Sequence, residues 1–303
     1  MINAKRSNAD SRTGSRGGRS PEDSMEHTAQ LRDSTIHYWV YNPGKDKTLV
    51  MIHGFTGDHY GFQKIIPYLA DYTIITPDLP GSGDSTITKK DWSIDAIARL
   101  TNEFVQSLRL EAPPYILGHS MGGLVVATMI HQAPHLYDSK VILLSPVPRK
   151  VTWGDSRWLS VRLGELQYKI GYTVPVFGPL LVKSKWITLL AAQILITTND
   201  KEIIRFTREQ MLNNLNRVSS VEFYYRITRD VSSRGVIDYV DTLRNKTVLF
   251  INGDKDMVAP LEQVRQVATQ AGASFATITG VGHDIHYERA NEAATIIKEF
   301  LTS

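Results

Sequence analysis

Residues 115–123 read YILGHSMGG, an apolar run that leads into the pattern Gly-x-Ser-x-Gly around Ser120. The residues that follow, 122–131, have a helical pattern, so the sequence predicts a strand, a sharp turn and a helix, with Ser120 on the turn. Such a turn lifts the serine hydroxyl above the sheet, and the helix N-terminus offers free N–H groups to an anion. The five-residue pattern alone also fits a glycine-rich turn with a capping serine, so the rest of the chain must decide.

Strand and helix patterns alternate along most of the sequence, which indicates an α/β fold. Short apolar, β-branched runs predict buried strands at residues 48–53, 72–76, 115–117, 141–144, 247–251 and 274–279. Helical periodicity predicts helices at residues 94–108, 122–131, 261–271 and 291–301. This order predicts a mainly parallel central sheet with helices on both faces. A weak alternation at residues 34–40 adds one or two antiparallel strands at the N-terminal edge.

One long segment interrupts this order. Residues 149–243 contain helical and loop patterns without a convincing strand, so we expect a mainly helical cap inserted into a core made of residues 31–148 and 244–303. The carboxyl edge of an open α/β sheet is where ligands bind, and a cap there would cover the site. Residues 1–30 are expected to form a disordered leader, because they begin with a stretch rich in Ser, Arg, Gly and Asn.

Composition excludes several classes of site and partner. Hydrophobic residues make up 42% of the 303 residues, enough for a full core, and the chain has no cysteine, which rules out disulfides and thiolate chemistry. The net charge of +3 gives no case for nucleic acid. The longest apolar stretch, residues 186–196, is too short to span a membrane, which takes about 20 residues. With no export signal, no zinc motif and no dinucleotide motif, we expect a cytoplasmic protein without metal or cofactor.

Three motifs together resemble the α/β-hydrolase fold family, and the resemblance covers roughly residues 34–301. They are HGF at residues 53–55, DLPGSGDS at residues 78–85 and GHSMGG at residues 118–123. The resemblance implies an oxyanion hole made by the backbone N–H groups of Phe55 and Met121. It also implies a structural role for residues 78–85, whose glycines permit a tight turn near the site.

A serine hydroxyl needs a base to take its proton, and nine histidines are available. His283 ends the stretch TGVGH at residues 279–283, in a loop just past the last predicted strand, where a side chain can reach over the sheet edge. In the family the base occupies this kind of Gly-His loop. His283 is therefore our candidate, and His286 is the alternative.

The acid must hold the imidazole in the correct tautomer and stabilise its charged form. The stretch NGDKDMVAP at residues 252–260 follows the fifth predicted strand. The family pattern, Gly-x-x-Asp followed by Pro, selects Asp256. Asp254 is the alternative, although its position suits a side chain that caps the turn.

Ser120, Asp256 and His283 occur in the chain order Ser…Asp…His that this fold uses. The sequence thus predicts a serine hydrolase in which Ser120 is the nucleophile and His283 the base. Relatives that are dehalogenases or epoxide hydrolases would need an aspartate at position 120, which disfavours those activities.

The predicted substrate is a small carboxylic ester, cleaved through an acyl-enzyme. Aromatic residues of the cap could line an acyl pocket or attach the cap to the core: Trp153, Trp158, Tyr168, Tyr172, Phe177, Trp186, Phe206, Phe223, Tyr224 and Tyr225. The alternatives are a lactonase, thioesterase, aminopeptidase or carbon–carbon bond hydrolase, or a non-catalytic ligand-binding member of the fold. We expect no nucleic-acid partner and no integral membrane association, and the sequence does not predict the oligomeric state.

Overall fold

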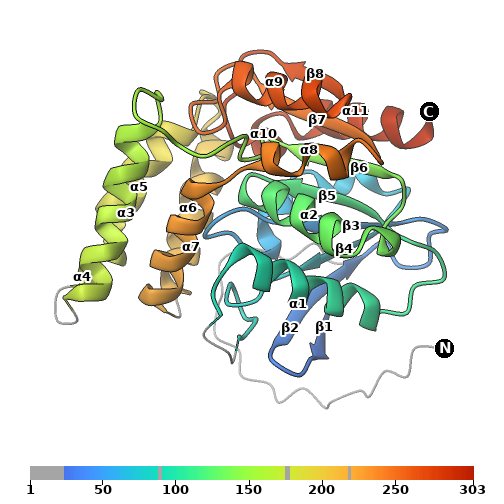
Figure 1. Ribbon diagram of the computed structural model, residues 1–303, viewed down its shortest axis with the longest axis horizontal. Coiled ribbons are helices and arrows are strands. Elements are labelled where there is room, and N and C mark those ends of the chain that lie inside the picture. Colours follow the sequence, from blue (N-terminus) through green and yellow to red (C-terminus); the bar gives the residue numbers. More distant parts are fainter. Residues whose placement is uncertain (1–23, 88–90, 175–177, 218–219) are drawn as a thin grey trace.

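The computed structural model describes residues 24–87, 91–174, 178–217 and 220–303. Eight strands form one sheet in the order β1-β2-β4-β3-β5-β6-β7-β8 (Figure 1). The strands are β1 Met25–Gln30, β2 Thr35–Tyr41, β3 Thr48–Ile52, β4 Thr73–Pro77, β5 Tyr115–His119, β6 Lys140–Leu144, β7 Thr247–Gly253 and β8 Ser274–Ile278. The two N-terminal strands are antiparallel to their neighbours and all other pairs are parallel. The predicted fold class is therefore confirmed.

The first strand corrects the predicted leader. Residues 25–30 form β1, which pairs with β2 from Met25 opposite Val40 to Gln30 opposite Thr35. The segment is polar because β1 is an edge strand with exposed side chains, and not because it lacks structure. The remainder of the predicted leader, residues 1–23, lies outside the described residues.

Helices cover both faces of the sheet. The core helices are α1 Ile94–Ser107, α2 Met121–Gln132, α8 Val240–Leu243, α9 Leu261–Ala271, α10 Ile285–Glu288 and α11 Ala290–Thr302, joined by short 3-10 turns at His59–Phe62, Ile66–Leu69, Pro134–Leu136 and Val236–Tyr239. Successive residues of one strand point to opposite faces: Leu49 and Met51 pack with α11, and Val50 and Ile52 pack with α1 and α2. Burial of both faces explains why the parallel strands are almost continuously apolar.

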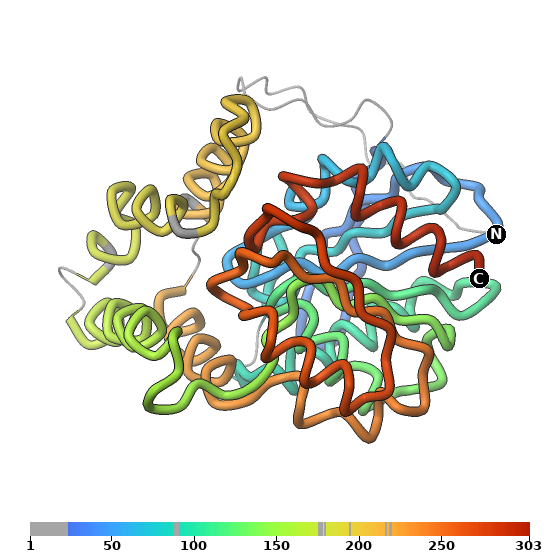
Figure 2. The backbone as a smooth tube through the Cα atoms, turned by 90° about the horizontal axis from the view of Figure 1, so that it is seen from above, coloured from blue at the N-terminus to red at the C-terminus, as the bar shows by residue number. Residues whose placement is uncertain are grey.

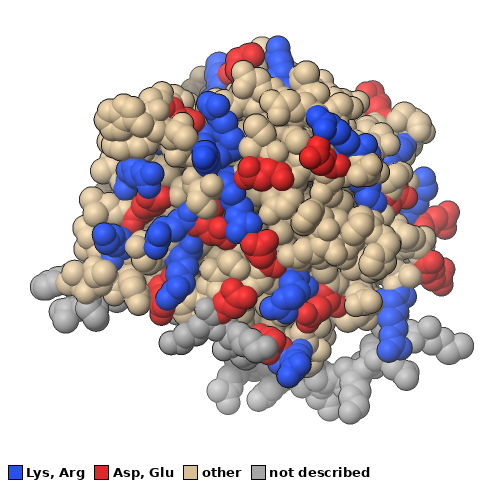
Figure 3. Space-filling view, in the orientation of Figure 1, with Lys and Arg blue, Asp and Glu red and all other residues tan. Residues whose placement is uncertain are grey.

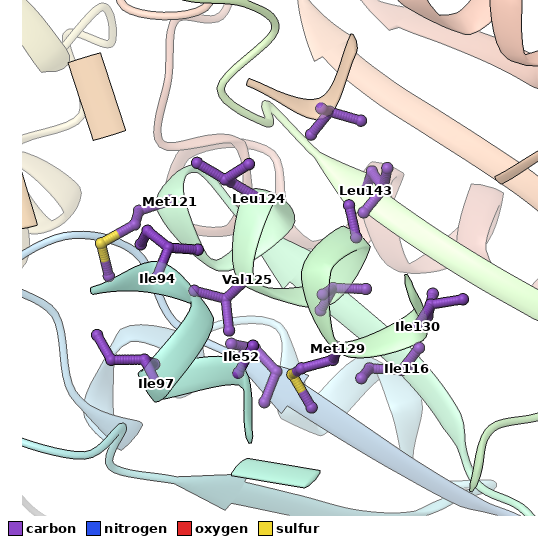
Figure 4. Close-up of a cluster of buried hydrophobic side chains, with 14 of the residues drawn as sticks. Ile52, Ile94, Ile97, Ile116, Met121, Leu124, Val125, Met129, Ile130 and Leu143 are labelled. Carbon is purple, nitrogen blue, oxygen red and sulfur yellow. The ribbon is translucent and has the colours of Figure 1, made fainter. Parts of the chain in front are cut away.

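The α2 helix lies at the centre of the larger cluster. Ten of its 12 residues are buried, so the helix is apolar on nearly every side. Figure 4 shows Met121, Leu124 and Val125 of this helix among isoleucines that come from β3 and α1. This packing fixes the helix against the sheet, and with it the position of its N-terminus.

The turn between β5 and α2 brings backbone against backbone. Ser120 has φ 55° and ψ −122°, a conformation that L-residues rarely adopt. A Cβ added at Gly122 would lie 2.2 Å from the carbonyl oxygen of Ile52, and one at Gly118 would lie 2.4 Å from the carbonyl oxygen of Gly122. The glycines on either side of Ser120 are therefore required by this close approach.

Between β6 and α8 the described chain forms five helices: α3 Trp158–Thr173, α4 Gly178–Val182, α5 Lys185–Leu195, α6 Lys201–Asn216 and α7 Val221–Ser233. We call them the helical insertion. None of the described residues between β6 and β7 forms a strand. Figures 1 and 2 show the insertion beside the core, at the end of the sheet to which the carboxyl ends of the strands point.

The close backbone approach at Gly122 should make the folded protein intolerant of a side chain at this position. Gly122→Ala should lower the free energy of unfolding by about 2–3 kcal/mol, or prevent folding, because no flexible side chain can move away from the new Cβ. Gly164→Ala is the matched control on α3, where a Cβ meets no atom within 4 Å. The control should stabilise the protein by roughly 0.5–1 kcal/mol through helix propensity. Urea unfolding measures both, and equal effects would contradict the account.

Candidate active site

The three side chains predicted to carry the chemistry meet at the carboxyl edge of the sheet. His283 Nε2 lies 2.8 Å from Ser120 Oγ, and His283 Nδ1 lies 2.9 Å from Asp256 Oδ2. All three residues are buried. They come from the ends of three different strands: Ser120 follows β5, Asp256 follows β7 and His283 follows β8.

Asp256 determines the tautomer of His283. Its Oδ1 accepts hydrogen bonds from the backbone N–H groups of Val258 and Ala259, at 2.8 and 2.7 Å, which leaves Oδ2 for the imidazole. Because this carboxylate only accepts hydrogen bonds, His283 Nδ1 carries the proton. His283 Nε2 then has a free lone pair and accepts a hydrogen bond from the Ser120 hydroxyl. This is the arrangement that a serine nucleophile and its base require.

The two charges of the Asp256–His283 pair stabilise each other. Burial alone would lower the pKa of His283, but attraction to Asp256 and their hydrogen bond outweigh it, so the pKa lies above its ordinary value of 6.5. Burial likewise opposes the charged form of Asp256, yet His283 and the two backbone N–H groups hold the pKa of Asp256 below 3.8. At neutral pH the acid is therefore an anion, ready to stabilise an imidazolium.

The two alternative candidates have other surroundings. Asp254 Oδ1 accepts a hydrogen bond from the Gly280 N–H at 2.7 Å, so this side chain ties the loop after β7 to the loop before His283. His286 is buried with its ring 4.1 Å from that of His119, and its Nδ1 has no hydrogen-bond partner among the described residues. Neither alternative is hydrogen-bonded to Ser120 or His283.

The two backbone groups predicted to bind an oxyanion flank Ser120. Met121 is the first residue of α2, so its N–H has no acceptor within the helix. Phe55 follows Gly54, and a Cβ added at Gly54 would lie 3.1 Å from Ser120 Cβ, which places this loop directly against the serine. His53 holds the loop in place: its Nδ1 donates to the Gly54 carbonyl at 2.9 Å, and its Nε2 accepts from the Leu79 N–H at 2.9 Å.

The loop at residues 78–85 packs next to the site and is hydrogen-bonded to His53 through the Leu79 N–H. Asp78 is fully buried and accepts hydrogen bonds from the backbone N–H and Nδ1 of His59 and from the Asp84 N–H. Gly83 has φ +55°, and a Cβ there would lie 2.0 Å from Asp78 Oδ2. The loop therefore needs glycine at this position, in keeping with a structural role.

A cavity of about 330 Å³ opens in front of Ser120 and His283. The core contributes His119 at the end of β5 and residues that follow β3 and β8, among them Phe55, Asp58, Asp284 and His286. The insertion contributes a largely apolar wall: Gln167, Tyr168, Val182, Ile187, Thr188, Ala191, Leu195, Gln210, Met211, Asn214 and Leu215. The insertion therefore lies over the carboxyl edge of the sheet at the site.

A family model described as the alpha/beta hydrolase fold matches residues 47–290. The chain belongs to the α/β-hydrolase fold family. Its membership and its relatives identify it as a hydrolase.

Two related sequences and two structures illustrate the likeness. The chain is 28% identical over 291 residues to the uncharacterized hydrolase YugF of Bacillus subtilis, covering 91% of this chain and 100% of YugF. It is 24% identical over 272 residues to human monoacylglycerol lipase ABHD6, covering 86% of this chain and 77% of the lipase. An esterase from Exiguobacterium antarcticum superposes with a TM-score of 0.75 at 20% identity, over 92% of this chain and 100% of the esterase. The enol-lactonase from Burkholderia xenovorans gives 0.73 at 18% identity, over 91% and 100%.

Of the aromatic residues proposed for an acyl pocket, Tyr168 lines the cavity. Trp153 and Trp186 are instead among the most exposed side chains of the described residues. Phe223 and Tyr224 are buried in the core cluster and so attach the insertion to the core. The position of Phe177 lies outside the described residues.

The sequence did not reveal the polar links between this hydrolase's insertion and the core loops around the candidate active site. Thr197, which follows α5, accepts a hydrogen bond from the Gly282 N–H at 2.8 Å and donates one to the buried Glu288. Arg217, at the end of α6, forms ion pairs of 2.7 and 2.8 Å with Asp58 and Asp84. No local pattern marks these residues, because each link joins segments at least 85 residues apart.

One group of described side chains could reach a common metal ion. The ligand atoms of His119, Asp284 and His286 lie within 4.8 Å of one another, and all three residues are buried. His119 Nε2 lies 3.2 Å from the His283 carbonyl oxygen, so this nitrogen donates to it and only Nδ1 is left as a ligand. Burial raises the pKa of Asp284 to about 7, so near neutral pH its carboxyl is partly protonated.

The opposing effects of burial and of Asp256 on the pKa of His283 can be measured without a substrate. An NMR titration should give a pKa above 6.5 for His283 in the wild-type protein. Asp256→Asn should lower that pKa below 6.5, by about one pH unit or more, because burial is then unopposed. Asp254→Asn, the matched control two residues away, should leave it unchanged. A larger shift with Asp254→Asn would reassign the acid.

Proposed function

We propose that this hydrolase cleaves carboxylic esters through an acyl-enzyme, with Ser120 as nucleophile, His283 as general base and Asp256 as the orienting acid. One observation carries the proposal: the hydrogen-bonded series Asp256–His283–Ser120 ends at a cavity with an apolar wall. A buried serine without a base would be inert, and a base without the carboxylate would lack a defined tautomer.

In the first half of the reaction Ser120 Oγ attacks the ester carbonyl while its proton passes to His283 Nε2. The carbonyl oxygen becomes an oxyanion, which accepts hydrogen bonds from the N–H groups of Phe55 and Met121. Asp256 stabilises the imidazolium formed at this step. Collapse of the tetrahedral intermediate breaks the ester C–O bond, and His283 gives its proton to the departing alcohol.

In the second half a water molecule takes the place of the alcohol. His283 Nε2 removes a proton from this water as its oxygen attacks the acyl carbonyl, and the same two N–H groups bind the second oxyanion. Collapse then releases the carboxylic acid and returns the proton to Ser120. Since His283 must be neutral at both attacks, its raised pKa means that activity falls as the pH drops below that value.

The cavity favours an acyl chain over a charged group. The wall contributed by α5 and α6 presents Ile187, Leu195, Met211 and Leu215, which suit a hydrocarbon. We propose on this ground that residues 149–243 act as a cap that selects the acyl group. The human relative is named a monoacylglycerol lipase, so monoacylglycerols belong among the first substrates to test.

An aminopeptidase would need a free carboxylate to hold the substrate ammonium. Two carboxyl groups line the described cavity, and neither suits that task. Asp58 is paired with Arg217 at 2.7 Å, and burial raises the pKa of Asp284 to about 7. Lactones and thioesters share the acyl-enzyme route, so a substrate panel must separate them from simple esters.

Covalent labelling tests the nucleophile. A fluorophosphonate should add one phosphonyl group to the wild-type protein, on the peptide that contains Ser120. Ser120→Ala should abolish labelling, whereas Ser145→Ala, a control at the buried serine just after β6, should still be labelled. Labelling of Ser120→Ala at the wild-type rate, read by intact mass, would refute the assignment. A folded wild-type protein that is never labelled would favour a non-catalytic ligand-binding protein.

A panel of p-nitrophenyl esters of increasing acyl length tests the cap. Ala191→Phe should shift kcat/KM towards shorter acyl chains, with roughly a tenfold loss for the longest ester, because the new ring fills space along the apolar wall. Gln193→Phe is the control on the same helix, since Gln193 is exposed and does not line the cavity. The same preference in both variants would mean that α5 does not contact the acyl group. Lactones, thioesters and aminoacyl anilides complete the panel.

A further inference from the structure

Exposed apolar side chains are concentrated on one part of the molecule. Of the 14 large hydrophobic residues that are exposed in the described chain, ten fall within residues 153–190, although these make up about an eighth of the sequence. Single exposed apolar residues are normal on any protein, but a contiguous group indicates an interaction surface. The first half of the helical insertion therefore differs from the rest of the surface.

The helices place these residues in ordered positions. Leu159, Leu163 and Leu166 follow the spacing of one helical face along α3. On α5, Trp186 and Leu190 are one turn apart and are 72% and 67% exposed. Figure 1 shows α3, α4 and α5 together at the left of the molecule, and we call these five side chains and Leu180 of α4 the outer apolar surface.

The opposite sides of the same helices form the cavity wall. Tyr168 of α3, Val182 of α4 and Ile187 of α5 all line the cavity. Each helix thus has one apolar side towards the candidate active site and another towards solvent. The outer side chains are not needed for the inner wall, so their exposure requires a separate explanation.

Cations dominate around the outer apolar surface. Residues 158–195 contain Arg162, Lys169, Lys183 and Lys185 but a single acid, Glu165, which pairs with Arg162. Residues 149–243 as a whole carry 14 Lys and Arg against nine Asp and Glu, a net +5, whereas the whole chain is +3, so the remainder sums to −2. Figure 3 shows Lys and Arg side chains over the insertion, at the left of the view, with some Asp and Glu between them.

We propose that the outer apolar surface rests on the surface of a lipid bilayer with anionic headgroups. Leucine and tryptophan side chains flanked by lysine and arginine are the composition of helices that lie in a membrane interface. None of the described helices is long and apolar enough to cross a membrane, so the contact is peripheral. A second copy of this chain is a poor occupant, because a symmetric interface would set these cations against one another.

This placement brings the cavity wall next to the bilayer. Because α3, α4 and α5 each span from the outer apolar surface to the cavity, a lipid-derived ester would meet the insertion where it leaves the membrane. Binding to the membrane itself does not depend on the proposed chemistry of Ser120. The two proposals can therefore fail separately.

Flotation with vesicles tests the proposal on the full chain. The wild-type protein should float with vesicles of phosphatidylcholine and phosphatidylglycerol, and more weakly with phosphatidylcholine alone. Raised salt should weaken the binding, because charged contacts at a surface are screened. Ser120→Ala should float like the wild type, which separates this result from the outcome of labelling.

Two pairs of substitutions locate the surface. Trp186→Ser with Leu190→Ser should lower the partition coefficient at least about tenfold, since two exposed apolar side chains no longer enter the interface. Tyr68→Ser is the control, because Tyr68 lies outside the helical insertion and is 44% exposed. Lys183→Gln with Lys185→Gln should reduce binding to anionic vesicles by roughly fivefold for each lysine. Lys45→Gln with Lys47→Gln, an exposed pair with the same spacing on the core, should change nothing.

Circular dichroism and urea unfolding check that the Trp186 and Leu190 variant is folded, because both should match the wild type. Wild-type protein that does not float, or a Trp186 and Leu190 variant that floats as well as wild type, would overturn the proposal. Light scattering measures the oligomeric state and so tests whether the surface joins two copies of the chain. A wild-type dimer that ignores vesicles and becomes monomeric in the Trp186 and Leu190 variant would show that the surface joins two copies instead.

Discussion

The rare backbone conformation of Ser120 is the constraint on which the site depends. A residue at φ 55° and ψ −122° costs on the order of 1–3 kcal/mol, and the surrounding structure must hold it there. The strand before it is paired on both sides, with β3 and with β6, and the helix after it is buried over ten residues. The strain is thus confined between two rigid elements. It aims the hydroxyl at His283 and the first N–H groups of α2 at the same point.

Burial then decides how the titratable groups behave. His283, Asp256, His119 and Asp284 share one buried region, and burial alone would favour the neutral form of each. Only the Asp256–His283 pair has enough mutual attraction to reverse that preference. His119, by contrast, has its pKa lowered to about 3, first by burial and then by the neighbouring His283. One imidazole of the site is therefore poised to accept a proton while another stays neutral.

The helices of the insertion face the cavity with one side and solvent with the other. Its inner sides line the cavity, Thr197 and Arg217 link it to core loops around the site, and its outer sides carry apolar and cationic residues. The core can keep its geometry under substitutions on the outer sides, because Ser120, Asp256 and His283 all follow core strands.

The sequence by itself determined the α/β fold class and identified Ser120, Asp256 and His283 as candidates, because each lies in a local pattern just after a predicted strand. Parallel strands bring their carboxyl ends to one edge, so local patterns sufficed to expect these residues near each other. The tertiary structure alone decided that residues 25–30 form an edge strand, since their partner strand and not their own polar composition orders them. It also decided the links made by Thr197 and Arg217, the exposure of Trp186 and the direction of the His283 pKa. Each of these depends on burial and on contacts between segments distant in the chain, which no local pattern encodes.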